Sequence, residues 1–504
     1  MRKTKVIFIK NALILTVTGI LIRFIGMFFR VWLAGKIGAE GIGLYSQVFS
    51  FYVLASAFAS TGINTAVTRM VSEELAVGNG KGVKIVLARC MAVSLTVALI
   101  SCGIIFFGAD FIAEKIVLDP RATDALRTLT LSLPFMGLSS CLKGYFIARK
   151  KTAPASSSQI FEQIVRIGVI AIIIGKQAGR GLAAACRGVI LGDCIAEICS
   201  CIFIYISYLI DKARHLEVCK GEKPQYSVFS RLRHIALPIT VGRYLNSTLR
   251  TAENVLVPQQ LEKFGMTGER ALSLFGVIKG MALPLIFFPA SFLNALSTLL
   301  IPEMSEASAA GKDYKVKYTA EKCIHITLIS SLPLAVIFFF TAPALGRVVY
   351  GDSDSGQIIR LLSPIIPLMY MDSVCDGLLK GLDEQLSIFR NSMIDSLSRL
   401  GLILFLLPKF GINGFIGIMY LSNLFTCSMN LFRLKKISSA RVRWFKWLVL
   451  PALCALILGT AIKLTVDIFT LTDIPYIICM ALPTATAYLV TVVRLGCIRP
   501  EDLK

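Results

Sequence analysis

Charged residues are scarce in this sequence. They make up 17% of the 504 residues, whereas apolar residues make up 55% and the mean hydropathy is +0.71. A set of soluble domains needs a larger polar surface, so this composition excludes an ordinary soluble protein. Long polar stretches are also missing, because apolar runs of about 20 residues, enough to span a bilayer as a helix, recur with short breaks. These runs are continuous rather than alternating, which predicts membrane-spanning α-helices and not a β-barrel.

Residues and motifs of common catalytic sites are lacking too. Histidine occurs only as His215, His234 and His325, which are too scattered to indicate a metal site or a histidine base. The 14 cysteines lie mainly in apolar segments without the paired spacing of a zinc site, which predicts buried reduced thiols. The segment Gly78–Lys81 lacks the spacing of a phosphate-binding P-loop. We therefore expect no cofactor, no metal and no enzymatic activity.

About fourteen apolar segments are long enough to cross a membrane. The run that follows Met1-Arg2-Lys3 extends to about Ala34, which is too long for a cleavable signal peptide, so we expect a retained first helix. The predicted spans lie near 8–33, 44–68, 85–107, 125–148, 158–175, 181–210, 232–258, 271–301, 318–342, 357–380, 388–408, 411–432, 444–466 and 474–497. The predicted fold class is an all-α polytopic membrane protein.

The basic residues, which give a formal net charge of +22, gather in alternate loops. If the chain begins in the cytoplasm, the cytoplasmic loops hold Arg149, Lys150, Lys151, Lys212, Arg214, Lys220, Lys223, Arg231, Arg233, Arg433, Lys435, Lys436, Arg441, Arg443 and Lys446. The opposite loops carry Asp110, Glu114, Asp119, Asp124, Asp352 and Asp354. The positive-inside rule then predicts an even number of spans with both termini in the cytoplasm. Because this distribution orients a membrane protein, we expect no nucleic-acid partner.

An internal repeat relates two parts of the sequence. A shift of 230 residues places Leu44-Tyr45 on Leu274-Phe275, Phe58 on Phe288, Asn64 on Asn294, Thr68 on Thr298 and Glu73 on Glu303; a shift of 233 places Glu162 on Asp395, Arg166 on Arg399 and Gly168 on Gly401. Six spans per repeat predict two lobes of the same orientation around a central cavity. We expect an N-terminal lobe at 1–210, an inter-lobe loop at 211–231, a C-terminal lobe at 232–436 and two additional helices at 437–504. Chance similarity among apolar helices is the alternative.

Cationic side chains inside the predicted spans are the most informative residues. An Arg near the middle of a span costs at least about 2.5–3.5 kcal/mol on insertion scales, so it usually faces a wet cavity or a partner. Arg23 and Arg30 lie seven residues apart on the first span, and so do Arg243 and Arg250 on the seventh, which places each pair on one helix face. With Lys279 on the eighth span, they predict a diphosphate site. For Arg30 and Arg243 the alternative is that each extends to the nearest membrane interface.

Two acid–base pairs recur in the halves of the repeat. Glu162 precedes Arg166 by four residues on the fifth span, and Asp395 precedes Arg399 by four on the eleventh. This spacing allows an ion pair within a helix, and pairing lowers the cost of each charge in the membrane. We predict that both pairs are structural.

Three further acids are candidates for ion coupling. Asp372 and Asp376 lie one turn apart on the tenth span, and Glu253 follows Arg250 by three residues. Close carboxylates share a proton or bind a cation, and so respond to ion gradients. The alternative for Asp376 is a solvated carboxylate near the cytoplasmic end of its helix.

Several segments together resemble a known group of membrane proteins. They are Arg23–Gly26 with Arg30, Gly62–Arg69, Gln159–Arg166, and Gly280–Pro284 followed by Phe288-Pro289. Over nearly the whole chain they resemble the polysaccharide transporter branch of the multidrug/oligosaccharidyl-lipid/polysaccharide exporter superfamily, which includes lipid II flippases. The resemblance implies two six-helix lobes in a V shape, alternating access, and two C-terminal helices associated with a groove for a lipid tail.

The resemblance also implies site residues. Arg23 and Arg30 match the first-helix arginines with which lipid II flippases hold the headgroup diphosphate, and Lys279 matches a basic residue on their eighth helix. One position departs from the family, because Ala282 stands where an acidic partner of that basic residue is expected.

These features favour a flippase for an undecaprenyl-diphosphate-linked saccharide, such as lipid II or a related cell-wall or spore-cortex precursor. The alternative within the superfamily is a cation-coupled multidrug or metabolite antiporter, for which we expect twelve spans and an acidic cavity. A third alternative, a non-transporting scaffold for wall or spore-coat assembly, leaves the intramembrane arginines without a role. The expected partners are the lipid-linked saccharide, membrane lipid and H⁺ or Na⁺, for a monomer in the bacterial cytoplasmic membrane.

Overall fold

The computed structural model describes residues 2–177, 181–216, 222–224, 226–469 and 471–497, which form helices joined by short turns. The helices are α1 (Arg2–Ser56), α2 (Gly62–Ala76), α3 (Gly80–Phe111), α4 (Thr123–Leu129), α5 (Leu133–Ala148), α6 (Thr152–Gln177), α7 (Leu182–Asp211), α8 (Val228–Lys263), α9 (Gly268–Gly276), α10 (Leu283–Ala309), α11 (Asp313–Leu345), α12 (Ser353–Leu362), α13 (Ile366–Gly381), α14 (Gln385–Ser438), α15 (Leu450–Val466) and α16 (Asp473–Arg494). These described ranges contain no β-strand, which confirms the all-α prediction.

Ten helical segments of the described residues are long and apolar enough to cross a membrane. Two of them are too long for one crossing, because α1 has 55 residues and α14 has 54. At 1.5 Å per residue each would measure about 80 Å, against a hydrocarbon core of about 30 Å. A glycine with positive φ divides each of them, Gly38 (φ 70°) in α1 and Gly411 (φ 54°) in α14. When α1 and α14 each count as two spans, the ten segments give about twelve. The short α5 and the charge-bearing α8 bring the number to about fourteen, which agrees with the prediction.

The chain forms two compact units. The first comprises Met1–Phe29, Lys36–Gln259 and Gly268–Ser273, and the second comprises Arg30–Gly35, Gln260–Thr267 and Leu274–Lys504. Two features of the predicted domain organisation stay predictions. They are the lobe boundaries at 210 and 232 and the separate segment at 437–504. Lys220 of the predicted cytoplasmic loop and the side chain of Thr298 lie outside the described part of the chain.

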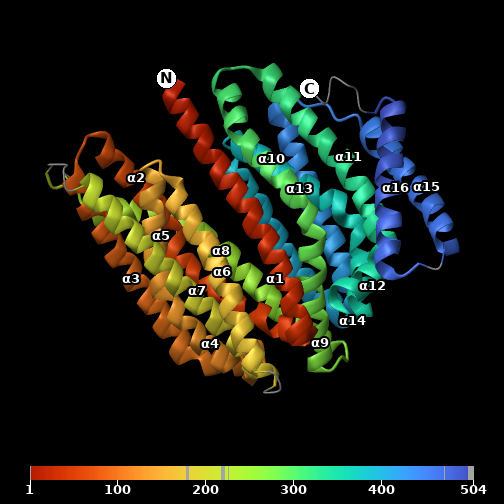
Figure 1. The fold of residues 1–504 in the computed structure, drawn as a ribbon, viewed down its shortest axis with the longest axis horizontal. Helices are drawn as coiled ribbons and strands as arrows, with labels where there is room; N and C mark the ends of the chain where they lie inside the picture. Colours follow the sequence, from red (N-terminus) through yellow and green to blue (C-terminus); the bar gives the residue numbers. More distant parts are fainter. Residues whose placement is uncertain (1, 178–180, 217–221, 225, 470, 498–504) are drawn as a thin grey trace. The chain divides into compact units, whose positions relative to one another are not determined.

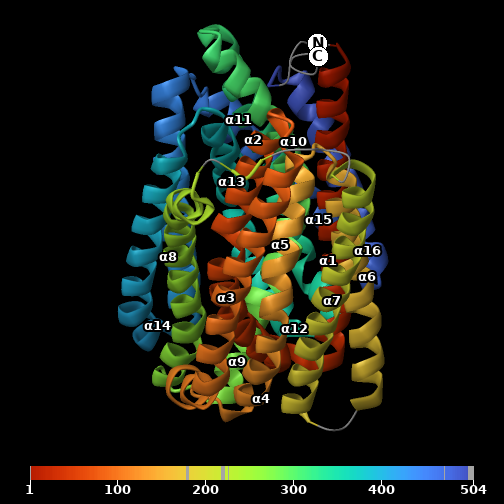
Figure 2. The ribbon, with the colours of Figure 1, turned by 90° about the vertical axis from the view of Figure 1, so that its left-hand side faces the viewer.

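In the first unit, α6 lies beside α7, and α3 packs against α5 (Figure 2). Gly192 permits the close approach of α6 and α7, because a Cβ atom there would lie 2.3 Å from Ile170 Cγ1. Tyr145 of α5 is fully buried in the core, and its hydroxyl donates to Asp211 Oδ2 at 2.6 Å. This bond ties the ends of α5 and α7 together.

In the second unit, α15 and α16 pack against α11 (Figure 1). Tyr488 of α16 is fully buried there, and its hydroxyl donates to the backbone oxygen of Ile329 at 3.1 Å. Gly459 of α15 meets Val336 so closely that a Cβ atom would lie 2.3 Å from Val336 Cγ1. The last two helices are therefore part of the core of this unit.

Left-handed turn residues occur at matching places in the two units. Gly78 and Gly311, Leu118 and Gly351, and Lys150 and Asp383 all have positive φ and lie 233 residues apart, and Gly181 and Gly411 lie 230 apart. Non-glycine residues rarely adopt this conformation, so its recurrence at the offsets found in the sequence supports the internal repeat.

A repeated contact supports it further. Asn64 Nδ2 donates to the backbone oxygen of Ser140 at 2.8 Å, and in the second unit Ser373 donates to Asn294 Oδ1. Both pairs join equivalent helices, α2 with α5 and α10 with α13.

Candidate functional site

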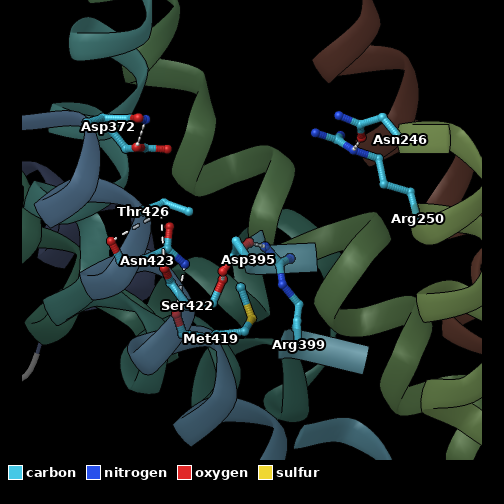
Figure 3. Close-up of polar contacts among 10 residues, drawn as sticks. Asn246, Arg250, Asp372, Asp395, Arg399, Met419, Ser422, Asn423 and Thr426 are labelled. Atoms are coloured by element: carbon cyan, nitrogen blue, oxygen red, sulfur yellow. Dashed lines mark hydrogen bonds and ion pairs between the residues drawn. The ribbon is translucent and has the colours of Figure 1, made fainter. Parts of the chain in front are cut away.

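Four arginines on α1 and α8 are exposed: Arg23, Arg30, Arg243 and Arg250. Arg250 Nε donates to Asn246 Oδ1 at 3.0 Å, which orients the guanidinium group without neutralising it (Figure 3). In the described ranges, no carboxylate forms an ion pair with any of the four arginines. A cation in a membrane span without a carboxylate partner indicates contact with water or with an anionic ligand.

Arg30 and Lys279 belong to the second unit. Lys279 is partly buried in a π-helical turn, η6 (Val277–Ala282), between α9 and α10. Tyr350 connects this turn to Arg30, because its hydroxyl donates to the backbone oxygen of Met281 at 2.9 Å and it lies within the electrostatic range of Arg30. Ala282, which stands where the resemblance predicts an acid, is fully buried. The acid that the resemblance predicts at position 282 is therefore absent.

A cluster of charged side chains is enclosed by the first unit, with Arg166 of α6 at its centre. Its Nη2 donates to Glu162 Oε1 at 2.7 Å, its Nη1 donates to Gln163 Oε1 at 2.7 Å, and its Nε lies 2.9 Å from Asp193 Oδ1. Asp193 of α7 also accepts a hydrogen bond of 3.0 Å from the Tyr45 hydroxyl. The ion pair predicted within one helix is thus one part of a contact between α1, α6 and α7.

Lys143 and Glu197 extend this cluster. Lys143 Nζ on α5 lies 3.7 Å from Glu162 Oε2, and Glu197 on α7 interacts electrostatically with both side chains. The cluster then holds three carboxylates against two cations, with Glu197 only 6% exposed. Such pairing permits the burial of charges that would each be costly alone.

The second unit encloses a polar cluster on α13 and α14. Asp395 pairs with Arg399 and also accepts a hydrogen bond from Ser422 Oγ at 2.6 Å (Figure 3). The two aspartate contacts come from the two halves of α14 on either side of Gly411. Asp395 therefore links successive spans in addition to forming the predicted pair.

Asp372 and Asp376 meet at one asparagine in the same unit. Asn430 Nδ2 donates to Asp372 Oδ1 at 2.9 Å and to Asp376 Oδ1 at 3.0 Å, while Asn430 Oδ1 accepts from Asn391 Nδ2 at 2.8 Å. The structure therefore brings these two candidate acids together. Glu253, the third candidate, is 6% exposed on α8 and belongs to the first unit.

The two clusters differ in charge at equivalent positions. At a shift of 233 residues, Lys143 corresponds to Asp376 and the uncharged Ser139 corresponds to Asp372. The second cluster thus has three carboxylates against the one guanidinium of Arg399, and the exposed Lys380 is the cation that flanks Asp376. This excess of acid is suited to a proton or a small cation.

Several members of these clusters are not among the site residues predicted from the sequence. Lys143, Asp193 and Glu197 carried the same signal as the predicted residues, a charge within an apolar span. Asn430 and Ser422 are neutral and carried no signal, because only the packing of α14 places them beside the aspartates.

Comparison with known proteins shows the family to which this chain belongs. The family described as polysaccharide biosynthesis protein matches residues 8–262. Stage V sporulation protein B of Bacillus subtilis (strain 168) is 30% identical over 414 residues, which are 81% of this chain and 79% of that protein. This chain belongs to the polysaccharide biosynthesis protein family. The MatE family matches residues 263–404.

Other relatives agree with this membership and with the predicted superfamily. The lipid II flippase MurJ of B. subtilis is 22% identical over 402 residues, 75% of this chain and 73% of that protein. Among solved structures, lipid II flippase MurJ in an inward closed conformation aligns with a TM-score of 0.73 at 15% identity, covering 96% of this chain and 99% of that one. An inward-facing multidrug resistance MATE transporter aligns with a TM-score of 0.64 at 13% identity, covering 85% and 100%. These proteins are flippases, transporters and sporulation proteins, in agreement with the expectation that the chain is not an enzyme.

Proposed function

We propose that this protein is a flippase that moves an undecaprenyl-diphosphate-linked saccharide across the bacterial cytoplasmic membrane by alternating access. The substrate is lipid II or a related precursor of the cell wall or spore cortex. One observation carries the proposal: in a family that serves polysaccharide synthesis, Arg23, Arg30, Arg243 and Arg250 are exposed on predicted spans, and no described carboxylate pairs with them. Both termini lie in the cytoplasm, as the basic loops indicate.

The contrast among the cations of the spans supports a role in anion binding. Lys143, Arg166 and Arg399 each have a carboxylate partner, which explains their presence in the membrane structurally. Arg23 and Arg250 have none in the described ranges, so the cost of placing them there requires another partner. A diphosphate supplies several anionic oxygens, and guanidinium groups bind such oxygens with paired, charge-assisted hydrogen bonds. Lys279 supplies a further cation in the second unit.

A multidrug antiporter is the alternative within the superfamily. Such a transporter binds organic cations and requires acidic rather than basic groups along its path. The exposed arginines therefore favour the flippase.

The substrate proposal is tested in cells from which other lipid II flippases have been removed. We expect depletion of this protein to reduce the lipid II that an external probe reaches. Arg23→Ala or Arg250→Ala should lower that exposure by about ten- to a hundredfold, because each removes a charge-assisted contact of about 1.5–3 kcal/mol. Arg187→Ala is the control, since Arg187 is exposed and lies 3.6 Å from Asp124. If depletion of a protein that was present at its usual level does not change the amount of lipid II that the probe reaches, lipid II is not the substrate.

We also propose that Asp372, Asp376 and Glu253 couple the cycle to H⁺ or Na⁺. The shared bond to Asn430 supports this for the two aspartates, because two close carboxylates are stabilised by one shared proton or one bound cation. Asp372→Asn should make the flipping rate in proteoliposomes insensitive to an imposed pH or Na⁺ gradient. A variant that responds to both gradients like the unmodified protein would exclude Asp372 from coupling.

A further inference from the structure

A cavity of about 360 Å³ lies between the last two helices and the adjoining ends of α11 and α12. All of its walls belong to the second unit. The apolar part is formed by Phe339 and Phe340 of α11, Val466 of α15 and Leu471 in the following turn. Figure 1 shows that the turn between α15 and α16 lies at the same end of this unit as α12.

The polar part of the cavity has an excess of positive charge. Arg347 Nε lies 3.0 Å from Asp473 Oδ2, and Lys463 Nζ lies 2.5 Å from Asp467 Oδ2, so two of the cations are neutralised. The third cation is Arg360, whose guanidinium carbon lies 4.8 Å from the centroid of the Phe339 ring. Within the described ranges, Arg360 has no carboxylate partner. Three cations and two carboxylates leave a formal charge of +1.

The first half of the repeat shows what is missing beside Arg360. The equivalent residues, 233 positions earlier, are Arg127 and Phe106, and the guanidinium of Arg127 lies over that ring at 6.0 Å. There, however, Arg127 Nη2 also lies 2.7 Å from Asp110 Oδ2. Asp110 corresponds to Pro343, which lines the cavity. The second half has the arginine over the aromatic ring but has no carboxylate at the position of Asp110.

The cavity lies at the end of the helices that faces away from the cytoplasm. The opposite ends of the same helices are basic, with Lys312 and Lys315 at the start of α11 and Arg443 and Lys446 before α15. The positive-inside rule assigns those ends to the cytoplasm. The cavity is therefore at the level of the outer headgroups, with polar groups beside an apolar wall.

We propose that this cavity binds an anionic glycerophospholipid of the outer leaflet, as a site separate from the proposed transport path. The lipid phosphate supplies the negative charge that Asp110 supplies in the first half, and it accepts hydrogen bonds from Arg360. One acyl chain lies along Phe339, Phe340 and Val466. Because the cavity joins α11 and α12 to α15 and α16, the lipid holds the appended helices against the rest of the unit.

The test compares lipid binding to the purified full-length protein by native mass spectrometry. The probes are phosphatidylglycerol, phosphatidylcholine with the same acyl chains, and inorganic phosphate. We expect the unmodified protein to bind phosphatidylglycerol at least tenfold more tightly than phosphatidylcholine. Arg360→Gln should weaken phosphatidylglycerol about tenfold and abolish the preference, whereas Arg360→Lys should retain most of it. Arg127→Gln is the matched control and should leave the preference unchanged.

A second variant keeps the proposal testable if Arg360→Gln fails to fold. Pro343→Asp introduces the carboxylate that the first half has at the equivalent position, and it should neutralise Arg360 and remove the lipid preference. The proposal is overturned if the unmodified protein shows no preference, if Arg127→Gln loses it equally, or if Pro343→Asp retains it. Inorganic phosphate that competes with phosphatidylglycerol at equal concentration would also overturn it, because the site would then recognise an anion and not a lipid.

Discussion

Replacement of Arg166 by Met tests whether the charged cluster of the first unit is structural. Arg166 makes three contacts of 2.7–2.9 Å with Glu162, Gln163 and Asp193. Its removal leaves three carboxylates against Lys143 alone, in a region where Asp193 is 15% exposed. Breaking a buried pair by removing one partner costs about 3–5 kcal/mol, because the other charge stays buried.

The expected result is a large loss of thermal stability. At about 2–4 °C per kcal/mol for a unit of this size, Arg166→Met should lower the unfolding temperature in detergent by about 6–20 °C. The matched control is Arg69→Met, which removes a guanidinium group that is 64% exposed and pairs with Glu73, and should change the unfolding temperature by less than about 2 °C. The double variant with Asp193→Leu should recover at least half of the loss, because it removes a carboxylate left without its cation. Equal unfolding temperatures for the Arg166 and Arg69 variants would show that the charged cluster does not stabilise the first unit.

Two further predictions concern packing and pH. Gly62→Ala should destabilise the protein by about 1–3 kcal/mol in chemical unfolding, because its Cβ would lie 2.3 Å from the backbone oxygen of Ala236. Gly168→Ala is the control and should be neutral or stabilising, because nothing lies within 4 Å of the added atom. A larger destabilisation by Gly168→Ala than by Gly62→Ala would contradict the close contact between α2 and α8. Hydrogen bonds from Arg433 hold the pKa of Glu384, in the turn before α14, below its ordinary value. The stabilisation is therefore present above the unfolded-state pKa of about 4.3 and is lost as the pH falls through the lower folded-state pKa. Glu384→Gln should lower the unfolding temperature slightly at neutral pH and not at pH 3, and a loss of equal size at both pH values would argue against this ion pair.

The spans and the repeat could be predicted from the sequence because each depends on local composition. Apolar runs of membrane length identify a helix without knowledge of its neighbours, and matched polar residues such as Asn64 and Asn294 identify the repeat. The residues at which the helices begin and end were harder to predict. At Gly38 and at Gly411 one residue with non-helical φ and ψ separates two helices, so the helices on either side extend into the predicted breaks at 34–43 and 409–410.

The clusters could be predicted only in part because their contacts join different helices. The spacing of Glu162 and Arg166 predicts a pair within one helix, but nothing in the sequence predicts that Asp193 completes it from α7. The same holds for Asn430, which reaches Asp372 and Asp376 from the second half of α14. The difference between Arg127 and Arg360 could likewise be recognised only by combining the repeat with the structure, since only the structure shows that each arginine lies over a phenylalanine.

Recognition of the diphosphate is tested most directly by the flipping rate of purified protein in proteoliposomes with two substrates that differ only in the headgroup linkage. One is an undecaprenyl-diphosphate-linked saccharide, and the other carries the same saccharide on a single phosphate. We expect the unmodified protein to move the diphosphate at least tenfold faster. Arg23→Ala and Arg250→Ala should each remove most of this difference, and Arg187→Ala should keep it. Equal rates for the two substrates, or an unchanged preference in both arginine variants, would contradict the proposal that these exposed arginines bind the diphosphate.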